Sequence, residues 1–140
     1  MRLPFLHKLY VKKITGDASG VERERAETIV SAILRELPEL IGVSVVDIRT
    51  GKTLAAYTAL ASFDPYKVSS RNVELIRQTL RMLTAPWLAD QQLTDFTVLL
   101  EDQLHCMRLT ANNQWFCYLA VRTADANMAL VREVMRRCTT

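Results

Sequence analysis

The sequence predicts a single α+β domain in which helices cover both faces of a five-stranded antiparallel sheet. Helix-like and strand-like runs follow one another in the order α-β-β-α-β-β-β-α, and each group of strand-like runs is joined by connections of hairpin length. The chain has 140 residues, which suits one domain that can bury a core without disulfides or a structural metal.

The first helix is expected over residues 21–37. Pro38 should end it, because the residue before a proline is pushed out of the helical region. Charged residues cover one side of this segment, whereas its apolar residues recur at the spacing of a single helical face: Ala26, Ile29, Val30, Ile33, Leu34 and Leu37.

Two strand-like runs follow, over residues 42–49 and 52–57. Thr50-Gly51 separates them, and Gly51 can adopt the positive φ that tight hairpin turns require. Asp47 is expected at the strand end beside this turn.

A three-stranded meander is expected near the C-terminus. Its strands are residues 96–100, 104–109 and 115–121, and Asn112-Asn113 is a suitable tight turn because asparagine tolerates left-handed conformations.

Two further helices have identifiable start signals. Asp64 is a good N-cap with Pro65 at the first helical position, and this central helix should continue to about Thr84. The last helix should begin at Asp125, a second capping carboxylate, and run to about Cys138.

The central helix has more apolar surface than one sheet can cover. One stripe contains Ser69, Val73, Ile76, Leu80 and Leu83, and a second stripe at heptad spacing contains Val68, Leu75 and Met82, with Asn72 and Thr79 between the two. Either the N-terminal arm or the Trp87-Leu88 loop covers the second stripe, or a second chain does. We favour self-association through a pair of these helices.

The positive charge is concentrated at the N-terminus. Residues 1–20 hold Arg2, Lys8, Lys12 and Lys13 against Asp17, which accounts for the whole formal net charge of +3. Residues 21–140 hold 14 basic and 14 acidic side chains, so this body gives no electrostatic case for binding nucleic acid. We divide the chain into a basic extension over 1–20, which is either a packed arm or a docking segment, and a domain over 21–140.

Pro4 and His7-Lys8 interrupt any apolar run near the N-terminus and no run approaches about 20 apolar residues, so we expect no secretory signal and a cytoplasmic protein without membrane insertion. Cysteine usage agrees, because Cys106, Cys117 and Cys138 are widely spaced and form no CxxC motif. We expect buried free thiols, with an adjacent dithiol of Cys106 and Cys117 as the alternative.

Sequence motifs for catalysis are missing. There is no phosphate-binding glycine loop, no HExxH and no GxSxG, and the two histidines with three cysteines do not form a zinc set. His105 lies within an expected strand, where a packed histidine is more common than a catalytic base, although a triad formed in space is an alternative. We expect no enzyme, no metal and no cofactor.

Two segments resemble the roadblock/dynein light chain family. Residues 37–55, from Leu37-Pro-Glu-Leu-Ile-Gly-Val through Asp47 and the glycine turn to Leu54-Ala55, are similar to the family's opening helix end, connector and first hairpin. Residues 126–136, with Asn127 and Arg132 at the matching positions, are similar to its closing helix. The resemblance covers about residues 21–138.

The resemblance implies a profilin-like sandwich that forms homodimers by pairing its central helices and often its third strands. The implied interface residues are Val68, Asn72, Leu75, Thr79, Met82, Phe96 and Val98, with Thr94 also near the dimer axis. Proteins of this family regulate or scaffold Ras-like small GTPases, or act as adaptors in motor and signalling complexes. One bacterial member is a GTPase-activating protein that inserts no arginine, so no arginine finger is nominated here.

Partner contacts are assigned to the polar side of the central helix, at Arg71, Arg77, Gln78 and Arg81. The leading hypothesis is a cytoplasmic homodimer that binds a small GTPase and changes its switch conformation or its location. The alternatives are a small-ligand sensor with a closed pocket near Trp115 and Cys106, and a passive adaptor in a larger complex.

Overall fold

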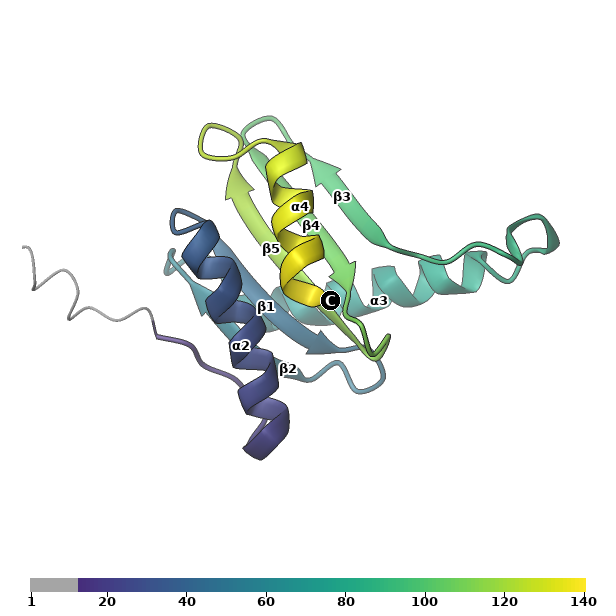
Figure 1. Ribbon diagram of the computed structural model, residues 1–140, viewed down its shortest axis with the longest axis horizontal. Coiled ribbons are helices and arrows are strands. Elements are labelled where there is room, and N and C mark those ends of the chain that lie inside the picture. Colours follow the sequence, from purple (N-terminus) through teal and green to yellow (C-terminus); the bar gives the residue numbers. More distant parts are fainter. Residues whose placement is uncertain (1–12) are drawn as a thin grey trace, which may run out of the picture.

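The computed structural model describes residues 13–140. Arg2, Lys8 and Lys12 of the predicted basic extension lie outside the described residues. Along the chain the elements are α2 (Gly20–Glu36), β1 (Gly42–Asp47), β2 (Thr53–Thr58), α3 (Pro65–Met82), the 3₁₀ helix η1 (Pro86–Leu88), β3 (Asp95–Leu99), β4 (Gln103–Leu109), β5 (Trp115–Arg122) and α4 (Met128–Thr139) (Figure 1). Apart from η1, this is the predicted order.

The five strands form one sheet in the order β2-β1-β5-β4-β3, and every neighbouring pair is antiparallel. The two predicted strand groups meet where β1 pairs with β5, with Gly42 opposite Ala120 and Asp47 opposite Trp115. β2 and β3 are consequently the outer strands of the named sheet.

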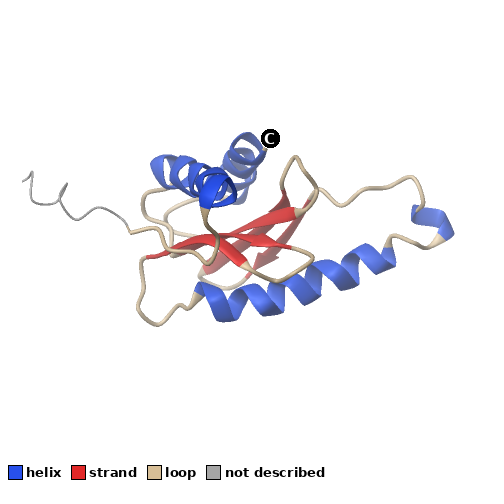
Figure 2. Cartoon of the chain, turned by 90° about the horizontal axis from the view of Figure 1, so that it is seen from below, coloured by secondary structure: helices blue, strands red, loops and turns tan. Residues whose placement is uncertain are grey.

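The helices cover opposite faces of the sheet. α2 and α4 lie side by side on one face, which we call the α4 face, and α3 lies alone on the other, the α3 face (Figure 2). The larger core fills the α4 face and includes Val30, Ile33, Leu119, Val131 and Val134, all buried. A smaller core on the α3 face includes Val46, Val73, Ile76, Phe116 and Tyr118. The predicted sandwich with helices on both faces is thus confirmed.

The predicted turns form for the expected reasons. Gly51 has φ +77° and Asn113 has φ +56°, both in the left-handed region. Asp47 stabilises the first turn, because its Oδ1 accepts hydrogen bonds from the backbone N–H groups of Arg49 and Thr50.

The start of α3 is also as predicted. Asp64 Oδ1 accepts from the backbone N–H groups of Tyr66, at 2.9 Å, and Lys67, at 3.4 Å. The helix ends at Met82, two residues before the predicted Thr84, and tighter turns carry the chain onward.

The predicted start of the last helix is wrong by three residues. α4 begins at Met128, and its cap is Asn127, whose Oδ1 accepts from the N–H of Leu130 at 2.8 Å. Asp125 instead lies in a turn closed by its own N–H to the carbonyl of Arg122. This turn places Ala126 in the core, so the helix starts only after that buried residue.

Residues upstream of the predicted domain boundary contribute to the fold. The N–H of Thr15 donates to the carbonyl of Ala56 at 2.9 Å, and the N–H of Ala56 donates back to Thr15 at 2.8 Å. The N–H of Asp17 also donates to the carbonyl of Thr53, at 2.8 Å, and the side chain of Ala18 is buried. Residues 13–18 therefore belong to the folded unit.

None of the helices in residues 13–140 has both the length and the apolar composition needed to cross a membrane.

Replacing the α3 cap should destabilise the protein. Asp64→Ala removes a side chain that satisfies two backbone donors, so the free energy of unfolding should fall by about 1 kcal/mol in urea denaturation. Asp90→Ala is the matched control, because the Asp90 carboxylate is exposed outside the regular elements and accepts a hydrogen bond from the neighbouring side chain of Gln91 rather than from a helix N-terminus. Equal losses in the two variants would contradict the capping role.

Candidate protein-interaction surface

The two edges of the sheet differ in whether another segment of the chain is hydrogen-bonded to them. Residues 13–17 cover the β2 edge with the backbone hydrogen bonds described above, so its N–H and C=O groups are partly occupied. On the other side β3 pairs with β4, and no described segment pairs with its outer edge. An unpaired strand edge is a template for adding a strand from another chain.

The second apolar stripe of α3 lies beside the sheet-facing side of the helix. We call Val68, Asn72, Leu75, Thr79 and Met82 the α3 stripe. Val68 and Leu75 are half-buried against the smaller core, whereas Met82 is 57% exposed. The five predicted dimer residues of α3 therefore share one side of the helix, and the last of them, Met82, is exposed.

Asn72, in the middle of the α3 stripe, has an unsatisfied amide. Its Nδ2 is buried and has no hydrogen-bond partner among residues 13–140. A buried donor without a partner costs roughly 1–3 kcal/mol. An acceptor supplied from outside the chain would remove this cost.

The C-terminal part of α3 and the connection to β3 project beyond the sheet (Figure 2). Trp87, in η1, is 78% exposed at this projection. The Trp87-Leu88 loop therefore does not cover the stripe at Met82, which was one of the two intramolecular explanations for it.

The α3 face is covered unevenly. α3 packs on β1 and β2, and the predicted interface residues Phe96 and Val98 on β3 are only half-buried. Thr94 precedes them and is exposed. These β3 residues and the α3 stripe thus form an interrupted apolar surface on the same side of the molecule.

The four predicted partner-binding residues differ in availability. Arg71 and Gln78 are exposed, and Arg81 makes an exposed ion pair with Glu74 at 3.2 Å. Arg77 is committed within the chain, because its guanidinium donates to the carbonyls of Ile48 and Arg49 at 2.7–3.1 Å. Arg77 thus ties α3 to the β1–β2 turn, a role that the sequence pattern does not reveal.

A polar cluster below this surface was missed from the sequence. His105 Nδ1 lies 2.8 Å from the hydroxyl of buried Tyr118, and its Nε2 lies 2.8 Å from Gln103 Oε1. Both contacts are satisfied if Nε2 carries the proton and the tyrosine donates to Nδ1. His105 is a packed residue on β4, as predicted, and its burial lowers its pKa from the ordinary 6.5. Burial likewise raises the pKa of the Tyr118 hydroxyl.

The edge strand is fixed from the α4 face. Arg132 on α4 donates to both carboxylate oxygens of Asp95 on β3, with Nε 2.6 Å from Oδ2. Burial raises the pKa of Asp95, but the hydrogen bonds from Arg132 and Thr94 outweigh it and hold the pKa below its ordinary range. Asn127 and Arg132, the two positions that match the family's closing helix, therefore cap α4 and hold β3.

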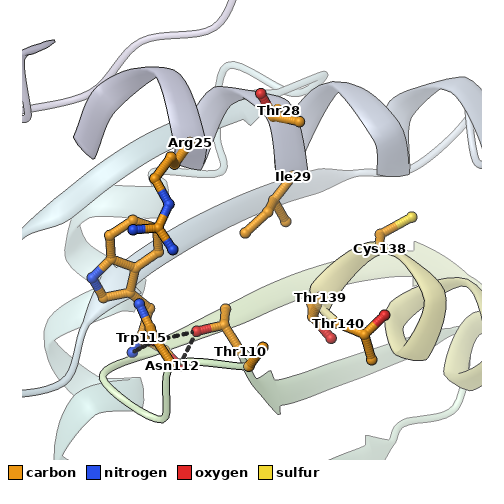
Figure 3. Close-up of a pocket in the computed structure, with 10 residues that line it drawn as sticks. Arg25, Thr28, Ile29, Thr110, Asn112, Trp115, Cys138, Thr139 and Thr140 are labelled. Carbon is orange, nitrogen blue, oxygen red and sulfur yellow. Dashed lines mark hydrogen bonds between the residues drawn. The ribbon is translucent and has the colours of Figure 1, made fainter. Parts of the chain in front are cut away.

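A cleft next to Trp115 is the location expected for a sensor pocket. It has a volume of about 270 Å³ between α2 and α4, and Arg25 lies over the Trp115 ring with its guanidinium carbon 5.3 Å from the ring centroid (Figure 3). Cys138 lines this open cleft, whereas Cys106 does not. The sensor hypothesis requires a closed pocket near Trp115 and Cys106. This cleft is open and Cys106 does not line it, so it does not meet that requirement.

The three cysteines are free thiols, as expected. Cys106 and Cys117 are buried on the neighbouring strands β4 and β5, and burial raises the pKa of both thiols. Cys138 is only half-buried, unlike the predicted core position. In residues 13–140 no three His, Cys, Asp or Glu side chains are grouped so that they could hold a metal ion.

Comparisons with known proteins identify the fold. No protein-family model and no curated protein matches the sequence. Among solved structures, MglB of Myxococcus xanthus is similar with a TM-score of 0.71 and 10% identity over 88% of each chain. A gliding protein MglB from Thermus thermophilus has a TM-score of 0.69 and 18% identity, over 89% of this chain and 90% of that one. A Roadblock/LC7 domain from Streptomyces avermitilis has a TM-score of 0.59 and 13% identity, over 78% and 87%.

At such identities the likeness establishes the fold. The chain has the roadblock fold, which confirms the architecture that the sequence resemblance implied.

The His105 cluster should make stability depend on pH. The unfolded chain binds a proton at His105 more readily than the folded one, so the free energy of unfolding should decrease as the pH falls below about 6.5 toward the lower folded-state pKa. His105→Gln removes this titrating group. The slope of the free energy of unfolding against pH should therefore become flatter between pH 7 and 5, by the equivalent of less than one proton. Urea denaturation at fixed protein concentration measures it, and parallel slopes for the two proteins would contradict this account.

Proposed function

We propose that the protein is a non-enzymatic, cytoplasmic homodimer that binds a Ras-like small GTPase and alters its nucleotide state or location. The observation that carries this proposal is the α3 face, where an amphipathic helix with a partly exposed apolar stripe projects beyond a sheet whose β3 half is incompletely covered. The roadblock fold and the resemblance of residues 37–55 and 126–136 to a family of GTPase regulators support the choice of partner.

A second copy of the chain fits the α3 face. Antiparallel pairing of two α3 helices would place each projecting end over the other chain's β3 half, where Phe96 and Val98 are half-buried. Fully burying an exposed large apolar side chain contributes roughly 1.5–3 kcal/mol before the entropy of association is subtracted. Exposed Met82 would gain the larger part of this on pairing, and Val68 and Leu75, which are already half-buried, would each gain a smaller part. The free β3 edge allows the two sheets to join as well.

The GTPase would contact the outer side of the paired helices. Arg71, Gln78 and the Glu74–Arg81 ion pair lie on this exposed side. Arg77 is held by two backbone carbonyls, so it serves better to position α3 than to enter a partner's active site. Any effect on GTP hydrolysis would then come from remodelling the switch regions of the GTPase rather than from an arginine finger. A passive adaptor would bind its partner without regard to the nucleotide.

The dimer is tested by charge placed in the α3 stripe. Leu75→Glu should convert the protein to its 15.9 kDa monomer in light scattering, because a buried carboxylate opposes helix pairing. Gln78→Glu adds the same charge on the exposed side of α3 and should leave the dimer intact. If the mass is the same for wild type and Leu75→Glu, the helix-pairing proposal is wrong.

The GTPase partner is tested by affinity capture from lysate of the native organism, in parallel with GDP and with a non-hydrolysable GTP analogue. A Ras-like GTPase should be recovered preferentially with the analogue, and the Arg71→Glu/Arg81→Glu protein should recover about tenfold less. Arg122→Glu reverses an exposed charge at the end of β5 and is the matched control. Recovery of no GTPase in either nucleotide state contradicts the proposal, and equal recovery in both states favours a passive adaptor.

A further inference from the structure

A groove lies on the α4 face between α4 and the edge strand. It has a volume of about 550 Å³, and its lining includes Arg108 of β4 and Met128, Arg132 and Arg136 of α4. The groove exists because α2 packs on β1 and β2 and α4 packs on β4, so neither helix covers β3 (Figure 1). It is within one chain and does not depend on the proposed dimer.

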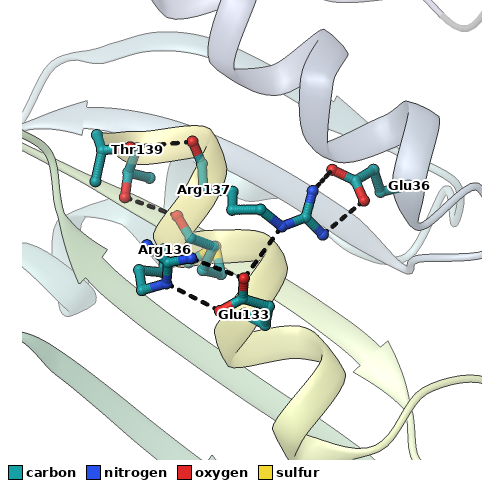
Figure 4. Close-up of polar contacts among 7 residues, drawn as sticks. Glu36, Glu133, Arg136, Arg137 and Thr139 are labelled. Atoms are coloured by element: carbon teal, nitrogen blue, oxygen red, sulfur yellow. Dashed lines mark hydrogen bonds and ion pairs between the residues drawn. The ribbon is translucent and has the colours of Figure 1, made fainter.

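Most charges around the groove already have partners. Arg132 holds Asp95, and Arg136 donates to both carboxylate oxygens of Glu133 at 2.8–2.9 Å (Figure 4). Glu133 also receives Arg137 at 3.3 Å. The acidic side chains at the groove are thus neutralised by arginines of α4.

Arg108 is the exception. It is directly opposite Asp95 in the β3–β4 register, but the Asp95 carboxylate is taken by Arg132. Within residues 13–140 the half-buried Arg108 side chain has no hydrogen bond or ion pair. A cation with five N–H donors therefore faces the groove without a carboxylate bound to it.

An apolar side chain completes the groove. Met128, at the start of α4, lines it and is 40% exposed. Arginine forks match carboxylates in two-point contacts, whereas an exposed methionine side chain favours an apolar partner surface. An occupant must consequently present carboxylates and an apolar side chain together.

We propose that this groove binds an acidic, partly apolar peptide segment of another protein. Carboxylates of the segment pair with Arg108 and with the Nη1 of Arg132 that Asp95 does not use, and an apolar side chain covers Met128. Nucleic acid would satisfy the arginines but would leave the exposed Met128 uncovered.

The test uses a fluorescein-labelled 12-residue peptide of repeating Glu-Glu-Leu-Glu, titrated with the full chain and followed by anisotropy. Saturable binding is expected, and Arg108→Gln should weaken it about tenfold, the effect of one charge-assisted contact. Met128→Ser should weaken it as well. Arg122→Gln removes an exposed arginine at the end of β5, outside the lining of the groove and outside the proposed GTPase surface, and should bind as tightly as wild type.

Several outcomes would overturn the proposal. These are no saturable binding at about 1 mM peptide, equal weakening by Arg108→Gln and Arg122→Gln, and tighter binding of a labelled 12-nucleotide single-stranded DNA than of the peptide. Circular dichroism and thermal melting of each variant show whether it is folded. Because Arg71 belongs to the proposed GTPase surface and Arg108 does not, failure of the peptide test and failure of GTPase capture are distinguishable.

Discussion

The pairing of β1 with β5 is the contact on which the rest of the fold depends. It joins a hairpin from the first half of the chain to a meander from the second, with Gly42 opposite Ala120 and Asp47 opposite Trp115. β5 thereby lies at the centre of the sheet and is buried at every position except its last. Because β5 is buried on both faces of the sheet, both faces must be covered by helices. α3 covers one face, and α2 and α4 cover the other. The same pairing makes β2 and β3 the outer strands.

The position of these outer strands dictates the projection of α3. The chain leaves the sheet at β2 and must re-enter at β3, so the connection that contains α3 has to pass from one edge of the sheet to the other. α3 packs on β1 and β2 at the start of this path, and a helix of 18 residues is about 27 Å long. Its end at Met82 lies beyond that contact and is 57% exposed. The exposed end of the stripe is thus a consequence of topology and helix length together.

Local sequence patterns are sufficient to predict the helices and strands. They do not predict the side-chain hydrogen bonds and ion pairs that join one element to another. Periodicity, the Asp64 cap and the Gly51 turn placed the helices and hairpins within a few residues, because each depends on neighbours along the chain. The start of α4 was misplaced because Asp125 and Asn127 are both good caps, and only the burial of Ala126 decides between them. Contacts such as Arg77 with Ile48 and Arg132 with Asp95 join residues 29 and 37 positions apart, so no local pattern could reveal them.

β3 links the two surfaces of the molecule. Its outer edge and the side chains of Phe96 and Val98 belong to the α3 face, whereas Asp95 is directed toward α4 and is held there by Arg132. In the proposed complex a carboxylate on Arg108 and on the Nη1 of Arg132 would lie next to Asp95, which keeps the Nε and Nη2 of the same guanidinium. The lowered pKa of Asp95 keeps its carboxylate ionised near neutral pH, so the ion pair with Arg132 is present there. β3 therefore carries both the contact with α4 that would neighbour a bound peptide and the edge where a second chain would pair.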